Sequence, residues 1–375
     1  MTREPVMIEN VTTDDGRRLA VDVTGAPDGY PVFLLHGTPG SRNGPKPRGI
    51  VLYRLGLQLI CYDRPGYGGS DRNEGRTVGD AAGDVATIAD KMGIDRFAVV
   101  GRSGGGPHAL ACAAVMPERV SSTAVLVSLA PSDAVGLDWY HGMNRQNVQE
   151  YGAADIDAQA LLTNLTSRAE QAQRDPRRFI DLVESELSEP DERVVGDVVL
   201  RRLLLDTYAE ALRPGAAGWF DDVLAFRKPW EIELSNITSR VRLWHGEDDR
   251  FSPVDHTRWL SQHIPQAQVE VQIQSGIGHF GAVEVLPEIR PGSPTASTSR
   301  GRPWHPRRRF RPSRWLPRTP SSEGIARISH PVEQLPCPQR RDRRMVLPQQ
   351  GCQVVDGSGR RVAAQQSSGT VTAPA

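Results

Sequence analysis

The sequence predicts an α/β protein with a mostly parallel sheet, helices on both faces of the sheet and an inserted helical cap. Short apolar segments of strand length alternate with segments of helical spacing, which is typical of a parallel sheet buried on both faces. This alternation stops after residue 130 and returns near residue 236, and the interval shows only helical spacing. We therefore assign residues 1–130 and 236–290 to the sheet-containing core and residues 131–235 to the cap.

The expected elements follow one another in a regular order. Residues 11–25 predict a hairpin, because Asp14-Asp15-Gly16 is a turn signal between two apolar runs. Wholly apolar or nearly apolar runs predict strands over residues 31–35, 57–62, 97–100, 120–129, 241–245 and 269–273. Helical spacing predicts helices over residues 77–92, ending at Gly93, and 108–116, and within the cap over 156–171 and 193–212.

A break in composition separates residues 291–375 from the rest. This segment holds 15 arginines, no lysine, four acidic residues and 12 of the 29 prolines. It cannot bury enough apolar surface to offset its chain entropy, so we expect it to be mostly disordered. Its basic run at 307–311 is the one stretch suited to nucleic acid, and we expect a solvated tail instead. The chain has 42 Arg and 3 Lys, which suggests a GC-rich gene and a frameshifted C-terminus, a hypothesis that resequencing tests.

The remaining composition excludes several classes of protein. The N-terminus lacks the apolar core of a signal peptide, and no apolar run approaches the roughly 20 residues that span a bilayer. The four cysteines, at positions 61, 112, 337 and 352, have no CxxC spacing. No metal, phosphate-loop or nucleotide motif is evident. We expect a soluble, cytoplasmic protein without a metal, a cofactor or a membrane partner, acting on a small molecule.

The most informative motif is the stretch Gly101-Arg102-Ser103-Gly104-Gly105. It lies between a predicted strand and a predicted helix, the context of a nucleophile elbow. Glycines two residues before and after the serine remove side chains that would clash in so sharp a turn. The turn would hold the serine hydroxyl at the end of a strand, where a base can reach it. The sequence therefore predicts a nucleophilic serine at position 103.

A serine nucleophile needs a base, and the base needs an orienting acid. Loops at the carboxyl ends of strands are the places to search. The loop after 241–245 supplies the adjacent carboxylates Asp248 and Asp249, and the loop after 269–273 supplies His279. Asp249 is the preferred acid, and Asp248 stays an alternative.

Over roughly residues 11–290 the chain resembles the α/β-hydrolases, a superfamily of serine esterases and peptidases. The resemblance is carried by motifs in the family's order: His36-Gly37-Thr38-Pro39, Asp63-x-x-Gly66-x-Gly68-x-Ser70, the elbow, and Gly246-x-x-Asp249-x-x-x-Pro253 followed by Gly278-His279. The serine–aspartate–histidine order along the chain is also the family's.

The resemblance implies a catalytic triad. Ser103 would be the nucleophile, His279 the general base and Asp249 the orienting acid. The backbone amides of Thr38 and Gly104 would form the oxyanion hole. Some relatives place the acid after an earlier strand, which makes Asp133 a further alternative. Arg102 stands where many relatives have histidine, and we expect it to pair with a carboxylate beneath the turn.

The implied activity is hydrolysis of a carboxylic ester or lactone through an acyl-serine intermediate. The cap aromatics Trp139, Tyr140, Trp219 and Phe220 could line an apolar substrate pocket or pack inside the cap. The cap carries 20 acidic and 11 basic residues, so it could instead hold a free α-amino group, as in a proline iminopeptidase-like aminopeptidase. A third reading is a non-hydrolytic cyclase or lyase, or a small-molecule receptor, because one fold hosts many functions.

Overall fold

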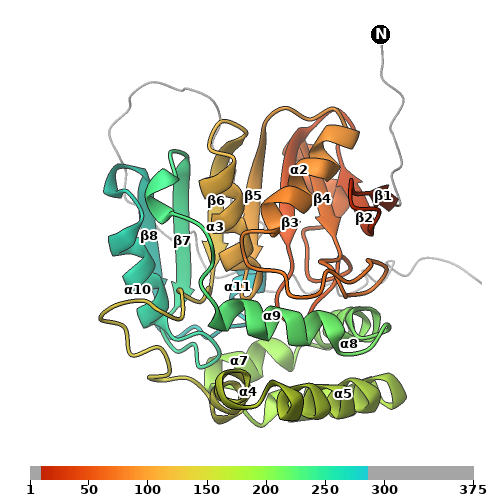
Figure 1. Cartoon of the computed structure of the whole chain (residues 1–375), viewed down its shortest axis with the longest axis vertical. Coiled ribbons are helices and arrows are strands. Elements are labelled where there is room, and N and C mark those ends of the chain that lie inside the picture. The colour runs from red at the N-terminus through yellow and green to blue at the C-terminus, as the bar shows by residue number, and fades with distance from the viewer. Residues whose placement is uncertain (1–9, 286–375) are drawn as a thin grey trace, which may run out of the picture. The chain divides into compact units, whose positions relative to one another are not determined.

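The computed structural model describes residues 10–285, so the interpretations of residues 1–9 and 291–375 lie outside the described part. An eight-stranded sheet has the order β1-β2-β4-β3-β5-β6-β7-β8 (Figure 1). The strands are β1 (Asn10–Thr12), β2 (Arg18–Gly25), β3 (Tyr30–Leu35), β4 (Leu57–Tyr62), β5 (Phe97–Arg102), β6 (Val120–Leu126), β7 (Arg240–Gly246) and β8 (Val269–Gln274). β2 pairs antiparallel with β1 and with β4, and every other pairing is parallel. The α/β class with a mostly parallel sheet is confirmed.

Strand β5 shows why a strand inside the sheet has an apolar sequence. Phe97 and Val99 belong to the core on one face of the sheet, and Ala98 and Val100 belong to the core on the other. All four side chains are buried. Because both faces are covered at this point, polar residues have no place in the strand, and the alternation of a half-exposed strand is absent.

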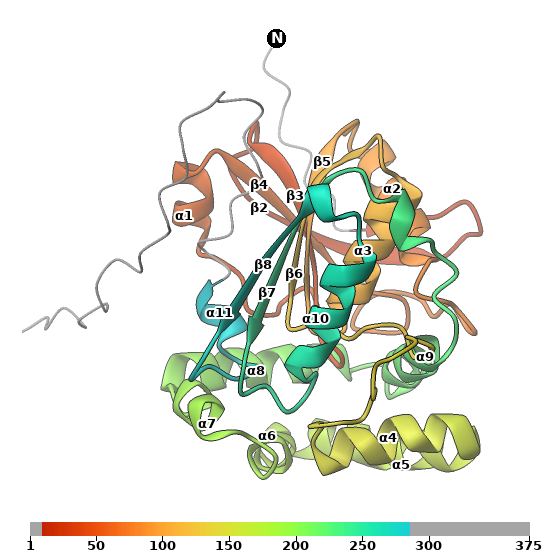
Figure 2. The ribbon, with the colours of Figure 1, turned by 90° about the vertical axis from the view of Figure 1, so that its left-hand side faces the viewer.

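Helices flank both faces of the sheet. On one side lie α2 (Ala81–Lys91), α3 (Gly105–Val115) and α10 (Val254–His263), and on the other α1 (Gly49–Arg54) and α11 (Ala282–Val285) (Figure 2). Short 3-10 turns, η1 (Leu234–Asn236) and η2 (Gln266–Gln268), lead into β7 and β8. No helix within residues 10–285 is long and apolar enough to cross a membrane.

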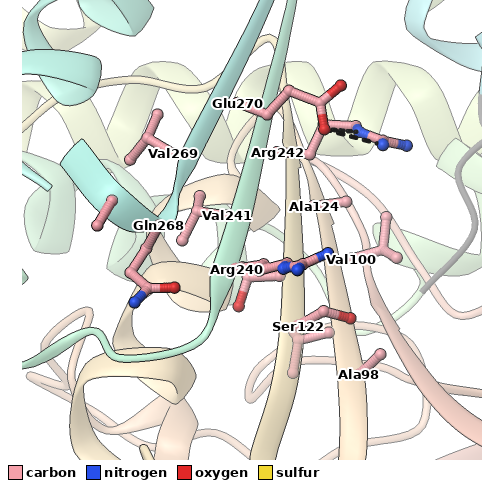
Figure 3. Close-up of a pocket in the computed structure, with 13 residues that line it drawn as sticks. Ala98, Val100, Ser122, Ala124, Arg240, Val241, Arg242, Gln268, Val269 and Glu270 are labelled. Carbon is pink, nitrogen blue, oxygen red and sulfur yellow. Dashed lines mark hydrogen bonds and ion pairs between the residues drawn. The ribbon is translucent and has the colours of Figure 1, made fainter. Parts of the chain in front are cut away.

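Part of the α1–α11 face has no helix over it among the described residues. A hollow of about 340 Å³ lies there, with Ala98, Val100, Ser122 and Ala124 on its floor (Figure 3). An ion pair between Arg242 and Glu270, 3.0 Å apart, joins β7 to β8 at its side (Figure 3). The hollow and the four-residue helix α11 lie on the same face of the sheet.

The interval between β6 and β7 is helical. It contains α4 (Arg145–Ile156), α5 (Ala158–Arg174), α6 (Pro176–Glu184), α7 (Glu189–Val195), α8 (Val198–Ala211) and α9 (Ala217–Arg227). These helices lie across the ends of the strands at which β5, β6 and β7 finish, at the bottom of Figure 1. This arrangement sets the cap helices over the same edge of the sheet as the loops that carry Ser103, Asp249 and His279.

The four predicted helices differ from the observed ones in their limits. The helix expected over 156–171 corresponds to α5, which begins at Ala158 because the Asp157 carboxylate accepts the Ala160 amide and caps it. The helix expected over 108–116 corresponds to α3 and begins earlier, at Gly105. The helix expected over 193–212 is interrupted at Gly196 and Asp197, where Asp197 caps α8. The helix expected from Thr77 begins at Ala81. Capping side chains compete with the helix backbone, so a continuous apolar period does not guarantee a continuous helix.

Candidate active site

Ser103 occupies the turn between β5 and α3. Its φ angle is 54°, a left-handed conformation that is uncommon for a residue with a side chain. A Cβ atom on Gly101 would lie 2.3 Å from the carbonyl oxygen of Gly105, and one on Gly105 would lie 2.2 Å from the oxygen of Leu35. Only glycine fits these two positions, so the turn can be this sharp and hold the serine at the strand end.

The structure brings Ser103, His279 and Asp249 together, although they come from three separate loops. The Nε2 atom of His279 lies 3.0 Å from Ser103 Oγ, and its Nδ1 atom lies 2.7 Å from Asp249 Oδ2. An ionised carboxylate only accepts hydrogen bonds, so Nδ1 carries the proton and donates to Asp249. Nε2 then has a free lone pair that can accept the serine proton. This is the geometry of a base held in its useful tautomer.

Asp249 is kept ionised by its surroundings. Burial by itself would raise the pKa of Asp249, but His279 and a hydrogen bond from His245 outweigh burial and leave the pKa below its ordinary value. The other carboxylate oxygen accepts the backbone amides of Phe251 at 2.7 Å and Ser252 at 3.0 Å. These bonds fix the carboxylate plane, so Asp249 orients the imidazole instead of taking up its proton.

The alternative acids lie elsewhere. Asp248 is exposed, and its backbone amide donates to Ile277. Asp133 is exposed too, and it borders a surface hollow with Pro229 and Trp230. Within the described residues, neither carboxylate contacts His279. The structure therefore brings Asp249, and neither alternative, against the histidine.

Two backbone amides beside Ser103 have no hydrogen-bond acceptor among the described residues, namely those of Thr38 and Gly104. The two residues pack closely, because a Cβ atom on Gly104 would lie 3.1 Å from the Thr38 nitrogen. Gly104 also precedes the first turn of α3, where the helix dipole adds positive potential. These donors could stabilise a developing oxyanion next to the serine.

A buried carboxylate from the cap, Asp222 of α9, holds the Thr38 loop. The Thr38 hydroxyl donates to it, Arg64 forms an ion pair with it, and Arg76 Nη2 lies 2.7 Å from its Oδ1 atom. Burial would raise the pKa of Asp222, but Arg64 and Arg76 outweigh burial and lower it. No local motif connects Asp222 to a loop more than 180 residues earlier, so this contact could not be predicted from the sequence.

Two further residues support the histidine loop. Asp191 of α7 accepts the backbone amides of His279, at 3.0 Å, and Phe280, at 2.7 Å. Ser252 Oγ lies 3.3 Å from Asp249 Oδ2 and donates to the Val127 carbonyl at 2.6 Å. Ser252 lies within the Gly246–Pro253 motif, which could have drawn attention to it. No sequence motif distinguishes Asp191 from the many other acidic residues of the cap.

A cavity of about 80 Å³ opens beside Ser103 and His279. Its walls include Arg102, Leu129, Glu150, Tyr151, Arg168, Val183, Tyr208, Trp219, Phe251 and Phe280. Of the four aromatic residues predicted for the pocket, Trp219 alone lines this cavity. Trp139 is buried against Tyr151 and His256, Tyr140 stacks on Arg227, and Phe220 packs against the core. A helical period predicts that an apolar residue is buried, but it does not predict which cavity the side chain lines.

Arg102 differs from its prediction. It lines the cavity, and no carboxylate within residues 10–285 forms an ion pair with it. Arg64 and Arg168 pair with the carboxylates nearby, so the expected partner beneath the turn is absent. No group of three or more His, Cys, Asp or Glu side chains in the described part is arranged to hold a metal ion.

Comparison with known proteins identifies the family. The family model described as alpha/beta hydrolase fold matches residues 30–284, and the chain belongs to this family. It is 25% identical to a bifunctional esterase/perhydrolase of Acinetobacter calcoaceticus over 65% of this chain and 83% of that protein. It is 32% identical to a proline iminopeptidase of Neisseria meningitidis, but over only 32% of this chain and 41% of that protein.

Among solved structures, a bromoperoxidase from Bacillus anthracis matches with a TM-score of 0.56 and 18% identity, covering 74% of this chain and 95% of that one. At this identity the likeness concerns the fold alone. The resemblance of the sequence to the α/β-hydrolases is therefore confirmed at the level of family and fold.

Proposed function

We propose that this protein is a serine hydrolase that cleaves a carboxylic ester or lactone. The observation that carries the proposal is the hydrogen-bonded series Ser103–His279–Asp249, with its distances of 3.0 and 2.7 Å. Ser103 Oγ attacks the carbonyl carbon while His279 Nε2 takes its proton. The amides of Thr38 and Gly104 stabilise the oxyanion. His279 then protonates the leaving alcohol, and water attacks the acyl-serine by the same route.

The walls of the cavity support an apolar acyl group. Leu129, Val183 and Phe280 line it beside Ser103 and His279, and such side chains suit the hydrocarbon part of an ester or lactone.

The charges of the cavity speak against the aminopeptidase alternative. Glu150, the buried carboxylate of the cavity, already pairs with Arg168 and accepts from Gln146 at 3.2 Å. A free α-amino group would have to displace Arg168 to reach Glu150. Arg102 adds a second positive charge to the same walls.

The direct test is turnover of a short-chain aryl ester by the purified protein. Ser103→Ala should lower kcat by about 10⁶-fold, the loss typical of removing a serine nucleophile. His279→Ala should lower kcat to a similar extent, whereas His263→Ala, at an exposed position, should leave it unchanged. A fluorophosphonate probe should label the wild type and not Ser103→Ala. Labelling without turnover of any ester or lactone would favour the cyclase, lyase or receptor reading and overturn the proposal.

A further inference from the structure

Arg102 has an unusual position for a charged residue. It ends β5, immediately before Ser103, and it lines the same cavity as Ser103 and His279. The side chain is half-buried, and Tyr208 of α8 is the titratable group that interacts with its charge. Tyr208 lines the cavity too. The guanidinium therefore belongs to the wall of the cavity next to the nucleophile.

Arg102 lacks a counter-ion, and this sets it apart from comparable arginines. Every other buried or half-buried arginine whose side chain the structure describes has a carboxylate at ion-pair distance; these are Arg17, Arg42, Arg64, Arg76, Arg119, Arg168, Arg201, Arg227 and Arg242. Within the described part, no side chain or carbonyl accepts a hydrogen bond from Arg102. Among the charged side chains that line the cavity in the described part, Arg102 is the one without a counter-ion.

The Arg102 nitrogens donate to no acceptor in the described part, and none of them is fully buried, so their N–H groups are free to donate to a molecule in the cavity. Burial of the side chain lowers the pKa of Arg102, but the guanidinium stays protonated at physiological pH and keeps its charge. A bound anion pairs with this charge. A carboxylate suits the planar guanidinium best, because its two oxygens accept two parallel N–H bonds.

The other charged groups of the cavity do not compete for this role. Glu150 is bound to Arg168, and Arg168 in turn stacks on Trp219 at 4.5 Å. This pair leaves the wall formed by α4 and α5 close to neutral. The wall formed by Arg102 keeps a net positive charge.

We propose that Arg102 forms an anion subsite and that the substrate is a short ester or lactone bearing a carboxylate close to the scissile carbonyl. This inference rests on the proposed function. With the carboxylate held at Arg102, the carbonyl lies within reach of the adjacent Ser103. Ser103 Oγ bonds to the carbonyl carbon as the bond to the alcohol oxygen breaks, and that oxygen takes the proton carried by His279. An ester releases its alcohol at this step, whereas in a lactone the alcohol stays attached to the acyl group. Water then cleaves the acyl-serine, which gives a dicarboxylate from the ester and a hydroxy dicarboxylate from the lactone.

Monoethyl succinate and two isosteres test the subsite. Ethyl succinamate replaces the carboxylate by a neutral amide, and ethyl 4-aminobutyrate carries an ammonium group instead. Wild-type kcat/KM should be about 10- to 100-fold higher for the hemiester than for the amide, the ratio typical of charge-assisted hydrogen bonds. The ammonium ester should be the poorest of the three.

Variants assign the preference to Arg102. Arg102→Gln should abolish the preference for the hemiester, measured as the ratio of kcat/KM for hemiester and amide within the same variant, and Arg102→Lys should retain part of that preference. Arg145→Gln, an exposed arginine of α4, is the matched control and should behave as the wild type. Equal rates for hemiester and amide in the wild type, or an unchanged preference in Arg102→Gln, would overturn the inference and leave the proposed function intact.

A binding measurement keeps the two proposals separate. Calorimetric titration of Ser103→Ala measures the Kd of monoethyl succinate and of ethyl succinamate without any turnover. Tighter binding of the hemiester, lost in Ser103→Ala/Arg102→Gln, would support the subsite even if the wild type hydrolysed neither ester. Equal Kd values for the two compounds would reject the subsite whatever the outcome for hydrolysis.

Discussion

Asp248 and Asp249 are neighbours in the sequence, and their surroundings differ completely. Asp249 is buried and accepts hydrogen bonds from His279 and two backbone amides, whereas Asp248 is exposed. The His279 and His245 side chains outweigh burial and hold the pKa of Asp249 below its ordinary value, so Asp249 is a carboxylate at neutral pH. A shift of one position in the loop therefore separates a buried carboxylate bonded to His279 from a solvated one.

This difference predicts opposite outcomes for two matched substitutions. Asp249→Asn should lower kcat by about 10⁴-fold, because the amide favours the wrong tautomer of His279. Asp248→Asn should change kcat by no more than about two-fold, as expected for a surface substitution. Steady-state kinetics with a short-chain ester measures both. A large loss in Asp248→Asn alone would show that the acid had been misassigned.

The same contrast shows what the sequence could and could not predict at single residues. Ser103 and His279 stood out because their neighbours form motifs with a steric reason. The two adjacent aspartates of one loop predicted where the acid lies, but not which of the two side chains contacts His279. Asp191 and Asp222 could not be predicted, because they act on backbone or side chains 88 and 184 residues away. The predicted ion pair between Arg102 and a carboxylate beneath the turn was wrong, because a charged side chain that lines a cavity needs no counter-ion inside the protein.

At the level of elements, strands were predicted better than helices. The inner strands β3, β4 and β5 are short runs of largely apolar and buried residues, so composition locates them, whereas β8 at the edge of the sheet has no buried side chain and alternates apolar with polar residues. The helical period over 193–212 continues across Gly196 and Asp197, and only the capping bond of Asp197 reveals the break. The hairpin formed by β1 and β2 was predicted from its turn signal and is joined to α2 by an ion pair, 3.1 Å long, between Arg17 and Asp84.

Asp84 makes stability depend on pH. Burial raises its pKa from 3.8 to about 6, and Arg17 opposes that rise only in part. The folded protein therefore binds this proton more tightly than the unfolded chain does. The stabilising contribution is fully present below pH 3.8 and is lost as the pH rises through about 6.

Urea unfolding of the wild type and of Asp84→Asn between pH 5 and pH 8 measures this contribution. The free energy of unfolding of the wild type, relative to the variant, should increase as the pH falls from 8 to 5. Asp90→Asn, at the exposed end of the same helix, should keep the wild-type profile. Parallel profiles for the wild type and Asp84→Asn would contradict the expectation.

Across residues 10–285, the cap and the sheet are joined through buried polar groups. Asp222 links α9 to Arg64 and Arg76, and Asp191 links α7 to the loop of His279. Asn147 of α4 donates to the Phe251 carbonyl at 2.9 Å. The cap is thus bonded to the core on several sides of the cavity, and its helices hold the loops that carry Thr38, Phe251 and His279 as well as covering them.

Adjacent aspartates in α9 test this junction. Asp222→Asn leaves two buried arginines without a full counter-ion and should lower the free energy of unfolding by about 3–5 kcal/mol. It should also lower kcat, because the Thr38 hydroxyl loses its charged acceptor. Asp221→Asn should cost much less, because its partner Arg72 is 36% exposed. Equal losses of stability in the two variants, measured by urea unfolding, would argue against the junction.

A cap fastened in this way limits how molecules enter and leave. It cannot swing aside as one body without breaking the Asp222 ion pairs and freeing the His279 loop. Exchange by rotation of side chains and small shifts of short segments leaves these bonds intact. For the proposed hydrolase, departure of the product is then expected to be slow, and turnover should fall as the solvent viscosity rises.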